Sequence, residues 1–389
     1  MNRNIKRVLA GAVLLTPLWM YMAWLCTPKK QLVAAIIDKT VLTSKGQEHA
    51  SFSWVLNHEK YTKNKTSLYD VSSDYFGFFP GKDEQYKLKG LERFSTNDLE
   101  KLSNDADLVY VTDAYGIYRN EWYKENRKTE RSGIVYGGMS TEDMHYLEMM
   151  KAKHKLILTE FNCIGSPTND HIRARFEENF GLRWTGWTGR YFNSLDTLEN
   201  PELPRWIIRD YQRDHNNQWN FKKAGIVFVN TTDEVVILET KNHLNDALPK
   251  IITNAAGTAH FNLPQTMPYP FWFDVTMADT AVNTVIANFS IDVNEAGKKS
   301  LTEKGIPCSF PAVQYHRQND YTFFYFSADF SDNPVNLFSS RFSAVESMKF
   351  LFYNHFDELN RAAFFWKYYR PLVTTILKDY YHTKPKASQ

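Results

Sequence analysis

Residues 155–180 read KLILTEFNCIGSPTNDHIRARFEENF, and this stretch gives the clearest indication of the fold. The apolar run Leu156–Leu158 is short and is followed by Glu160, as expected for a strand that is buried on both faces. A turn with Cys163 comes next, and a helix is predicted from about Asn169. Strand, sharp turn and helix in this order are typical of a layered α/β domain.

The same pattern recurs towards the N-terminus. The apolar run Leu32–Ile37 ends at Asp38, and the run Leu108–Val111 is followed by Asp113. Helix-capping signals lie between the three runs: Ser95 or Thr96 between the first and second, and Ser140, with an aspartate three residues further on, between the second and third. Strands that alternate with helices at this spacing predict a parallel sheet with right-handed crossovers.

The turn after the third strand approximates a nucleophile elbow, a strand-to-helix turn that presents a reactive side chain. The pattern G-x-C-x-G is met at Cys163 and at the second glycine, whereas Phe161 replaces the first. On these residues, the region 31–230 resembles the class I glutamine amidotransferase-like superfamily, which has a flavodoxin-like fold. Active members pair the cysteine with His and Glu from an H-x-E sequence. Neither His243 nor His260 has Glu two positions on, so the resemblance implies a degenerate member that lacks the Cys-His-Glu triad.

Cys163 is nevertheless a candidate nucleophile. A thiol at the N-terminal end of a helix can be stabilised as the thiolate by the backbone N–H groups. The alternative is a buried structural thiol, which the sequence leaves open.

Carboxylates at predicted strand ends form a second candidate site. Asp38, Asp113 and Glu160 would meet at one edge of the sheet, where open α/β sheets bind their ligands. Glu160 with either aspartate could serve glycoside hydrolysis, which needs two carboxyl groups. Asn162 and Lys39 would line the same rim. The alternative is that these acids only end strands or cap helices. No metal and no cofactor is predicted.

Aromatic residues make up 15% of the chain, and most lie in strand-like runs that a core would absorb. Trp184 and Trp187 lie in the sequence WTGWTGR, where exposed rings at the sheet rim could stack on sugar faces. The cluster Phe364–Tyr369 (FFWKYY) suits either a membrane interface or packing against the α/β domain.

The uncharged run Val8–Cys26 (VLAGAVLLTPLWMYMAWLC) predicts a transmembrane helix. No small-residue cleavage site closes the run, so an uncleaved signal anchor is favoured over a cleaved signal peptide. Three basic residues precede it, and Lys29 and Lys30 follow. By the positive-inside tendency, the N-terminus is expected in the cytoplasm and the rest of the chain outside it.

Composition argues against several classes of protein. The 389 residues carry 46 basic and 44 acidic side chains, a net charge of +2, which argues against nucleic-acid binding. Three cysteines are too few for a disulfide scaffold and too dispersed for a zinc site. A mean hydropathy of −0.47 excludes a polytopic membrane protein.

The sequence therefore predicts an N-terminal anchor (residues 1–30), an amidotransferase-like flavodoxin-like α/β domain (31–230), a β-rich extension (231–343) and a C-terminal helical segment (344–389). Two functions remain open. One is a non-catalytic domain that serves a cell-envelope process by binding a glycan or a partner protein. The other is an envelope carbohydrate-active hydrolase.

Overall fold

The computed structural model describes residues 15–123 and 132–384, and its centre is a ten-stranded mixed sheet. Five strands in the middle of the sheet run parallel, and antiparallel strands extend it at both edges. In sheet order the strands are β14 (Thr266–Pro268), β13 (Lys250–Thr253), β16 (Thr284–Ser290), β17 (Ser309–Arg317), β18 (Thr322–Phe326), β9 (Leu156–Glu160), β6 (Leu108–Asp113), β2 (Ala34–Asp38), β4 (Phe76–Pro80) and β5 (Tyr86–Lys89).

The three strands predicted from the apolar runs are confirmed as β2, β6 and β9. The predicted capping signal is confirmed as well: Ser140 Oγ accepts a hydrogen bond from Asp143 N (3.0 Å), and the Asp143 carboxylate accepts one from Ser140 N (2.8 Å). This reciprocal pair begins helix α6 (Thr141–Ala152).

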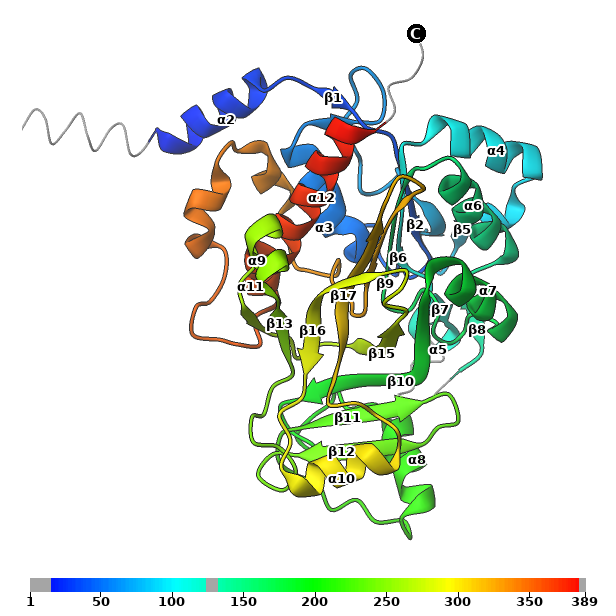
Figure 1. Cartoon of the computed structure of the whole chain (residues 1–389), viewed down its shortest axis with the longest axis vertical. Helices are drawn as coiled ribbons and strands as arrows, with labels where there is room; N and C mark the ends of the chain where they lie inside the picture. Colours follow the sequence, from blue (N-terminus) through cyan, green and yellow to red (C-terminus); the bar gives the residue numbers. More distant parts are fainter. Residues whose placement is uncertain (1–14, 124–131, 385–389) are drawn as a thin grey trace, which may run out of the picture.

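Helices cover both faces of the sheet, as expected for an α/β fold (Figure 1). One face carries α3 (Gln47–His58), α9 (Ala255–Phe261) and α12 (Arg370–Thr383). The other carries α4 (Thr96–Asp105), α6 and α7 (Asp170–Phe180).

Each parallel strand contributes to two cores because successive side chains point to opposite faces. In β6, Leu108 and Tyr110 belong to the core beneath α3 and α12, whereas Val109 and Val111 belong to the core beneath α6 and α7. Burial on both faces explains why the strand sequence is a continuous apolar run without polar alternation.

Residue 230 is the predicted end of the α/β domain. Strands from beyond this residue belong to the same ten-stranded sheet, so the sheet is not divided there. β18 pairs with β9 in parallel, with Phe326 beside Glu160. The sheet is thereby extended by residues far along the chain, and the carboxyl end of β18 lies next to that of β9.

A second, four-stranded antiparallel sheet lies at the carboxyl ends of the parallel strands (lower part of Figure 1). Asp274 N donates a hydrogen bond to Ser327 O (2.7 Å), just beyond β18, and so joins the two sheets. The order of its strands is β12 (Val235–Glu239), β11 (Gly225–Asn230), β10 (Leu182–Phe192) and β15 (Phe273–Ala278), and α8 (Arg205–Asp214) and α10 (Glu295–Glu303) accompany it.

Short elements complete the described chain. Two small sheets pair β1 (Lys30–Gln31) with β3 (Tyr61–Thr62) and β7 (Ile117–Tyr118) with β8 (Ile134–Tyr136). Short helices are η1 (Leu91–Arg93), α5 (Arg119–Trp122), η3 (Leu337–Arg341), η4 (Val345–Leu351), α11 (Arg361–Phe364) and η5 (Phe365–Tyr369).

The C-terminal segment contains the short helix η4 and a continuous helix over residues 361–383. Pro371 lies inside this continuous helix, directly after the π-helical turn η5, so the proline accompanies a local distortion of the helix without ending it. The aromatic residues of Phe364–Tyr369 are at most 5% exposed. They pack into the core beside α3, which confirms the packing interpretation and makes the membrane-interface alternative wrong for this cluster.

The predicted transmembrane run is only partly described, because residues 8–14 lie outside the described residues. Its remainder forms α2 (Thr16–Cys26), a helix of 11 residues. Among the described residues, none of the helices combines the length and the apolar character that crossing a bilayer requires.

Phe330 is central to the core and allows a test of the packing. Its ring is fully buried against Tyr269, Phe326, Phe364 and Tyr368, with centroid distances of 4.8–5.7 Å. We expect Phe330→Ala to lower the free energy of unfolding by about 3–5 kcal/mol through cavity formation. Urea unfolding followed by circular dichroism measures the change.

The matched control is Phe356→Ala, because this side chain is 98% exposed. It should change the stability by less than about 0.5 kcal/mol. Equal effects of the two substitutions would contradict the packing described here.

Candidate functional site

The strand-end aspartates lie together at the carboxyl edge of the sheet, as the sequence predicts. Thr40 links them: its N–H donates to Asp38 Oδ1 (3.0 Å), and its hydroxyl donates to Asp113 Oδ1. Asp38 also contacts His49 from α3, with Oδ2 and Nδ1 2.5 Å apart. Asp38 is fully buried and Asp113 is 4% exposed, so both are closed off by their partners.

Asn162 joins the same network. Its Nδ2 donates to Asp113 Oδ2 (3.4 Å), while Tyr115 N donates to Asp113 Oδ1 (2.5 Å). Burial raises the pKa of Asp113 well above its usual value, although the hydrogen bond from Thr40 lowers it. The Asp113 carboxyl group thus serves as a hydrogen-bond acceptor inside the fold.

Glu160 is a structural acceptor in this fold. Its Oε2 accepts hydrogen bonds from Phe330 N (3.1 Å) and Ser331 N (3.2 Å), and its Oε1 accepts one from the Ser331 hydroxyl. The side chain is fully buried, and burial raises its pKa well above the usual value. The predicted hydrolase pair of Glu160 with Asp38 or Asp113 therefore does not face an open cleft.

Lys39 was expected at the rim, and the structure places it elsewhere. It is 1% exposed, and its Nζ contacts Asp143 Oδ2 (2.5 Å) and Gly138 O (2.9 Å) at the start of α6. The alternation of side chains along an extended chain explains this difference, because Lys39 follows Asp38 directly and points to the opposite face.

Cys163 is fully buried, and its Sγ donates to Val111 O (3.3 Å). Burial raises the pKa of this thiol well above its usual value, so the neutral form is favoured. Within the described residues, none of the histidines hydrogen-bonds to this sulfur. These features suit a structural thiol rather than an activated nucleophile.

Trp184 and Trp187 are 8% and 5% exposed, so the expectation of exposed rings is wrong. Trp184 Nε1 donates to Trp187 O (2.9 Å), and the Arg173 guanidinium lies 5.1 Å from the Trp184 ring centroid. Trp184 packs in the core on the α7 side of the sheet, and Trp187 packs in the core on the other side.

A different group of charged residues reaches the surface at this edge. We call Glu48, Asp329, Asp332 and Arg361 the rim cluster. Arg361 Nη2 contacts Asp329 Oδ2 (2.6 Å), and Arg361 Nη1 contacts Asp332 Oδ2 (2.9 Å). The three carboxylates each offer an oxygen within 4.8 Å of the other two.

The strand-to-helix connections place these residues. Glu48 lies in the first turn of α3, which follows β2. Asp329 and Asp332 follow β18, and Arg361 begins α11. Three segments of the chain thus meet at the edge where parallel α/β sheets bind ligands.

The electrostatics of the rim cluster favour protonation of a carboxyl group. Burial raises the pKa of Glu48 well above its usual value, and the charges of Asp329 and Asp332 raise it further. Burial also raises the pKa of Asp329 to about 6, although Arg361 opposes this effect. Glu48 can therefore donate a hydrogen bond at a pH at which an isolated carboxyl group would be ionised.

One aromatic ring flanks the rim cluster. Arg361 lies over the Phe271 ring, with 4.5 Å between its Cζ and the ring centroid. Trp272 contacts the cluster through its backbone, where its O accepts a hydrogen bond from Asp329 N (3.3 Å), whereas its ring packs beside Phe192 at a centroid distance of 6.3 Å. Both rings are half-buried, so each keeps part of its surface accessible.

Three carboxylates at this spacing could also hold a divalent cation through oxygen ligands. However, the Arg361 guanidinium already contacts two of them and balances part of their charge. A cation would have to displace this arginine, so the residues do not fit a resident metal well.

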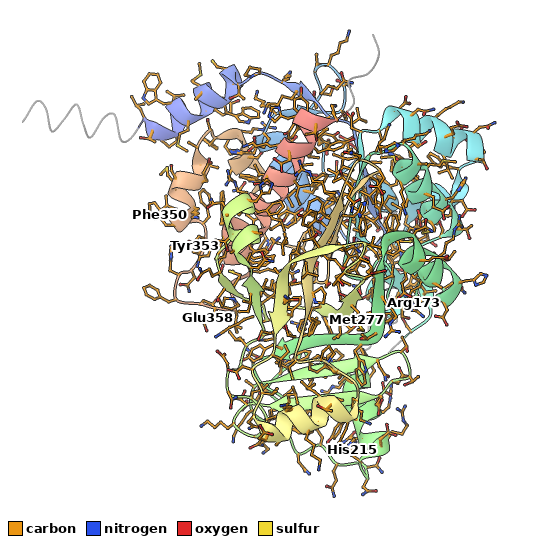
Figure 2. The ribbon with its side chains drawn as sticks, in the orientation of Figure 1. Arg173, His215, Met277, Phe350, Tyr353 and Glu358 are labelled. Atoms are coloured by element: carbon orange, nitrogen blue, oxygen red, sulfur yellow. The ribbon has the colours of Figure 1, made fainter. Side chains whose placement is uncertain are left out.

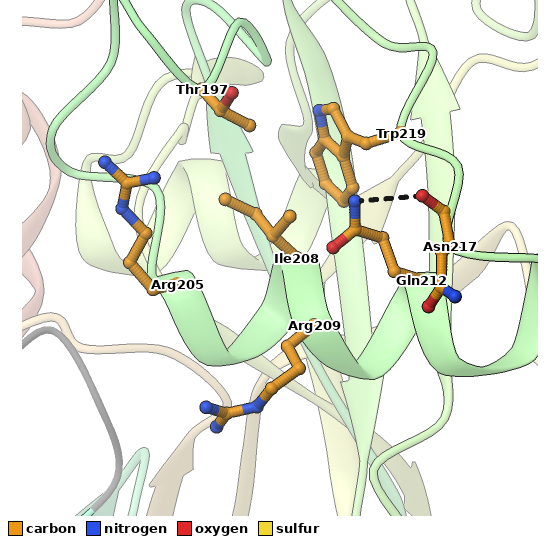
Figure 3. A pocket seen from close by; sticks show the side chains of 7 residues that line it. All are labelled: Thr197, Arg205, Ile208, Arg209, Gln212, Asn217 and Trp219. Atoms are coloured by element: carbon orange, nitrogen blue, oxygen red, sulfur yellow. Dashed lines mark hydrogen bonds between the residues drawn. The ribbon is translucent and has the colours of Figure 1, made fainter.

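A separate hollow lies on the four-stranded sheet beside α8. Figure 3 shows Arg205 and Arg209 on one side of it and Trp219 on the other. Gln212 Nε2 donates to Asn217 O (3.3 Å) across its end. This hollow is open and contains no acidic side chain, so it offers none of the proton chemistry of the rim cluster.

The sequence contained a signal for part of the rim cluster. The run Tyr321–Phe326 is recognisable as a strand, and the acids of the following segment ADFSD occupy the same position as Asp38 after β2. Glu48 and Arg361 have no such local signal, because only the packing of α3 and α11 brings them to this edge.

No protein family and no curated protein matches the sequence. A solved ThuA-like protein from Bacteroides uniformis is 9% identical, with a TM-score of 0.37 over 93% of this chain and 94% of its own. Another from Parabacteroides merdae is 9% identical, with a TM-score of 0.34 over 77% and 79%. The carbohydrate deacetylase Agd3 is 9% identical, with a TM-score of 0.32 over 77% of this chain and 29% of its own.

ThuA-like proteins belong to the class I glutamine amidotransferase-like superfamily, which the sequence also resembles. Because all three TM-scores lie below 0.5, the neighbours do not establish membership of that superfamily or an activity.

Asp274 allows a test of the buried charges. It is fully buried, accepts a hydrogen bond from the Thr188 hydroxyl (2.9 Å), and has its pKa raised by burial to about 7. A raised folded-state pKa stabilises the protein below the unfolded value near 4, and this stabilisation is lost as the pH rises towards 7. We compare how far the free energy of unfolding falls between pH 4 and pH 7 in the two proteins. This fall should be smaller in Asp274→Asn than in the wild type, and the difference should be roughly 4 kcal/mol.

Urea unfolding at several pH values measures this difference. Asp279→Asn is the matched control, because Asp279 is exposed and follows the same strand. An identical pH dependence of the wild type and Asp274→Asn would contradict the assignment of Asp274 as a proton-holding group.

Proposed function

We propose that this protein is a membrane-anchored, extracytoplasmic, non-catalytic glycan-binding protein that serves a cell-envelope process. In this proposal the α/β domain is a flavodoxin-like, degenerate relative of the glutamine amidotransferases. The rim cluster with Phe271 and Trp272 forms its binding site.

The rim cluster carries the proposal. Its carboxylates and Arg361 offer several hydrogen-bond donors and acceptors at fixed positions, which suits a ligand with many hydroxyl groups. Phe271 adds a partly accessible ring beside Arg361, and Trp272 is half-buried at the next position. An aromatic ring next to charged hydrogen-bonding groups can contact the apolar face and the hydroxyl groups of one sugar at the same time.

The buried groups support a non-catalytic role. Cys163 lacks a histidine partner within the described residues, and Glu160 is used to bind the backbone after β18. These contacts therefore do not support the Cys-His-Glu chemistry of the active members of the superfamily.

The location rests on the sequence. The uncharged run Val8–Cys26 and its flanking basic residues support a single anchor with the domain outside the cytoplasm. A glycan or an envelope protein would be the partner available there.

One observation favours glycoside hydrolysis as a second candidate. Carboxylate oxygens of Glu48 and Asp332 lie within 4.8 Å of each other, close to the roughly 5–5.5 Å between carboxyl groups in retaining glycosidases. The raised pKa of Glu48 suits a general acid. The hydrolase alternative would thus use the rim cluster instead of Glu160.

Calorimetric titration with oligosaccharides of neutral hexoses and of N-acetylated amino sugars tests the binding site. We expect Phe271→Ala to weaken binding at least about tenfold, or about 1.4 kcal/mol, because the ring beside Arg361 loses its contact with the sugar. Glu48→Gln should weaken binding less, since the amide keeps a donor and an acceptor. Asp279 follows the last residue of β15, at the opposite end of the strand from Phe271 and Trp272. Asp279→Asn should therefore bind like the wild type.

Release of reducing ends from the same oligosaccharides separates the two candidates. Binding without release supports the non-catalytic proposal. Release that Glu48→Gln abolishes while binding persists would favour the hydrolase instead, and wild-type affinity in Phe271→Ala would remove the rim cluster as the binding site.

The topology has its own test in intact cells stripped of any outer barrier. We expect externally added protease to digest the chain beyond Lys30, because this part lies outside the cytoplasm in our proposal. Cells permeabilised beforehand provide the control for protease activity. Complete protection of the chain in intact cells would overturn the orientation.

A further inference from the structure

Residues 349–359 read KFLFYNHFDEL and leave large apolar side chains in contact with solvent. We call this stretch the aromatic segment. Figure 2 shows its residues Phe350, Tyr353 and Glu358 in this order along the left margin of the molecule. Monomeric proteins rarely expose several large apolar side chains together, so a partner is expected to cover the segment. The side chains concerned are 36–98% exposed: Phe350, Leu351, Phe352, Phe356 and Leu359.

The aromatic segment is held in place by the domain. The Phe352 ring stacks on the ring of Trp366, with centroids 5.0 Å apart, and Trp366 is 5% exposed. Lys367 Nζ lies 4.9 Å from the centroid of the Tyr353 ring. Two local hydrogen bonds from backbone N–H groups to side chains follow within the segment. The exposed side chains therefore sit on a fixed backbone, and association costs less conformational entropy than it would for a loose loop.

Opposite charges lie at the two ends of the segment. Lys349 precedes the apolar side chains, whereas Asp357 and Glu358 lie near the other end. All three side chains are exposed, and within the part of the chain that the structure describes none of them forms a salt bridge. Lys250 feels the charge of Glu358 but is already paired with Asp246. The charges at both ends thus remain available to a partner.

We propose that the aromatic segment is the interface of a twofold-symmetric homodimer, in which the segments of two copies lie antiparallel. In such a dimer the same surface serves both partners, so it must be complementary to itself. Antiparallel packing brings Lys349 of one copy beside Asp357 and Glu358 of the other, at both ends of the interface. The apolar side chains of the two copies meet between these charges. This inference goes beyond the proposed function and does not depend on it.

The size of the apolar surface suits a dimer. A fully exposed aromatic side chain offers roughly 200 Å². With the exposures given above, the five apolar side chains present on the order of 500 Å² to solvent. A standard interface takes roughly 800 Å² from each partner, and somewhat more than half of this area is apolar. The aromatic segment and its polar neighbours therefore provide about the area that one side of an interface requires.

Both charge signs occur on the segment, and this limits its occupants. An anionic bilayer would repel Asp357 and Glu358. A partner protein of a single charge sign would meet like charge at one end of the segment. A second copy, turned by half a rotation, necessarily presents the two signs in the reverse order. It therefore matches the aromatic segment along its whole length.

Sedimentation equilibrium of the full-length chain in a density-matched non-ionic detergent measures the dimer. We expect the wild type to dimerise and Phe356→Ser to raise the dissociation constant at least about tenfold, because the most exposed ring leaves the interface. Leu198→Ser is the matched control: Leu198 is 92% exposed but lies outside the aromatic segment, so the dissociation constant should not change.

Both substituted side chains are exposed in one copy, so folding should be unaffected, which circular dichroism checks. Dimerisation stabilises the folded chain at high protein concentration. The unfolding of Phe356→Ala is therefore compared with that of the wild type at dilutions at which the dimer dissociates.

Charge reversal tests the antiparallel arrangement. Lys349→Glu places like charges opposite each other, and so does Asp357→Lys combined with Glu358→Lys. Each variant alone should dimerise several-fold more weakly than the wild type. An equal mixture of the two variants restores opposite charges at both ends of the mixed dimer, so this dimer should form about as well as the wild-type dimer. Rescue in the mixture also shows that both variants are folded.

Three outcomes would overturn the proposal. The first is a wild-type chain that remains monomeric at roughly 0.1 mM. The second is a dimer whose dissociation constant none of the substitutions in the aromatic segment changes, because association would then occur elsewhere in the chain. The third is a mixture of the two charge-reversal variants that dimerises no better than either variant alone, because the segments would then not lie antiparallel.

Discussion

The arrangement of the rim depends on the buried carboxyl group of Glu160. It accepts two backbone N–H groups and one hydroxyl from Phe330 and Ser331, and so binds the chain beyond β18 to the end of β9. Buried backbone donors must find acceptors, and here a single side chain supplies them. The attachment places Asp329 and Asp332 on either side of the bound residues, at the edge where Glu48 and Arg361 reach them.

The carboxyl edge of the sheet therefore separates two kinds of acid. Asp38, Asp113 and Glu160 point into the protein, where they satisfy a histidine, a threonine and the backbone. In the rim cluster, Glu48 and Asp329 are only partly buried, Asp332 is 7% exposed, and Arg361 contacts both aspartates. Burial decides between these roles, because a fully enclosed carboxyl group can hold the fold together but cannot meet a large ligand.

Much of the fold was predictable from short apolar runs. The strands before Asp38 and Asp113 and the capped helix at Ser140 follow from local chemistry, namely burial on both faces and the satisfaction of helix N–H groups. The candidate site was less predictable. Lys39 and Trp184 have the residue types of a binding rim, but their side chains point into the core, and this depends on the twist and packing of neighbouring strands.

The sequence by itself determined the α/β layering, the uncharged N-terminal run and the convergence of strand-end acids at one edge, because each depends on a periodicity or composition within a few residues. Tertiary structure alone decided which acids are buried and which are accessible. It also decided that Phe364–Tyr369 fills the core while the aromatic residues just before it remain exposed. These outcomes depend on contacts between segments that are distant in the chain, such as Glu48 on α3 with Asp329 and Asp332 after β18, which no local pattern encodes.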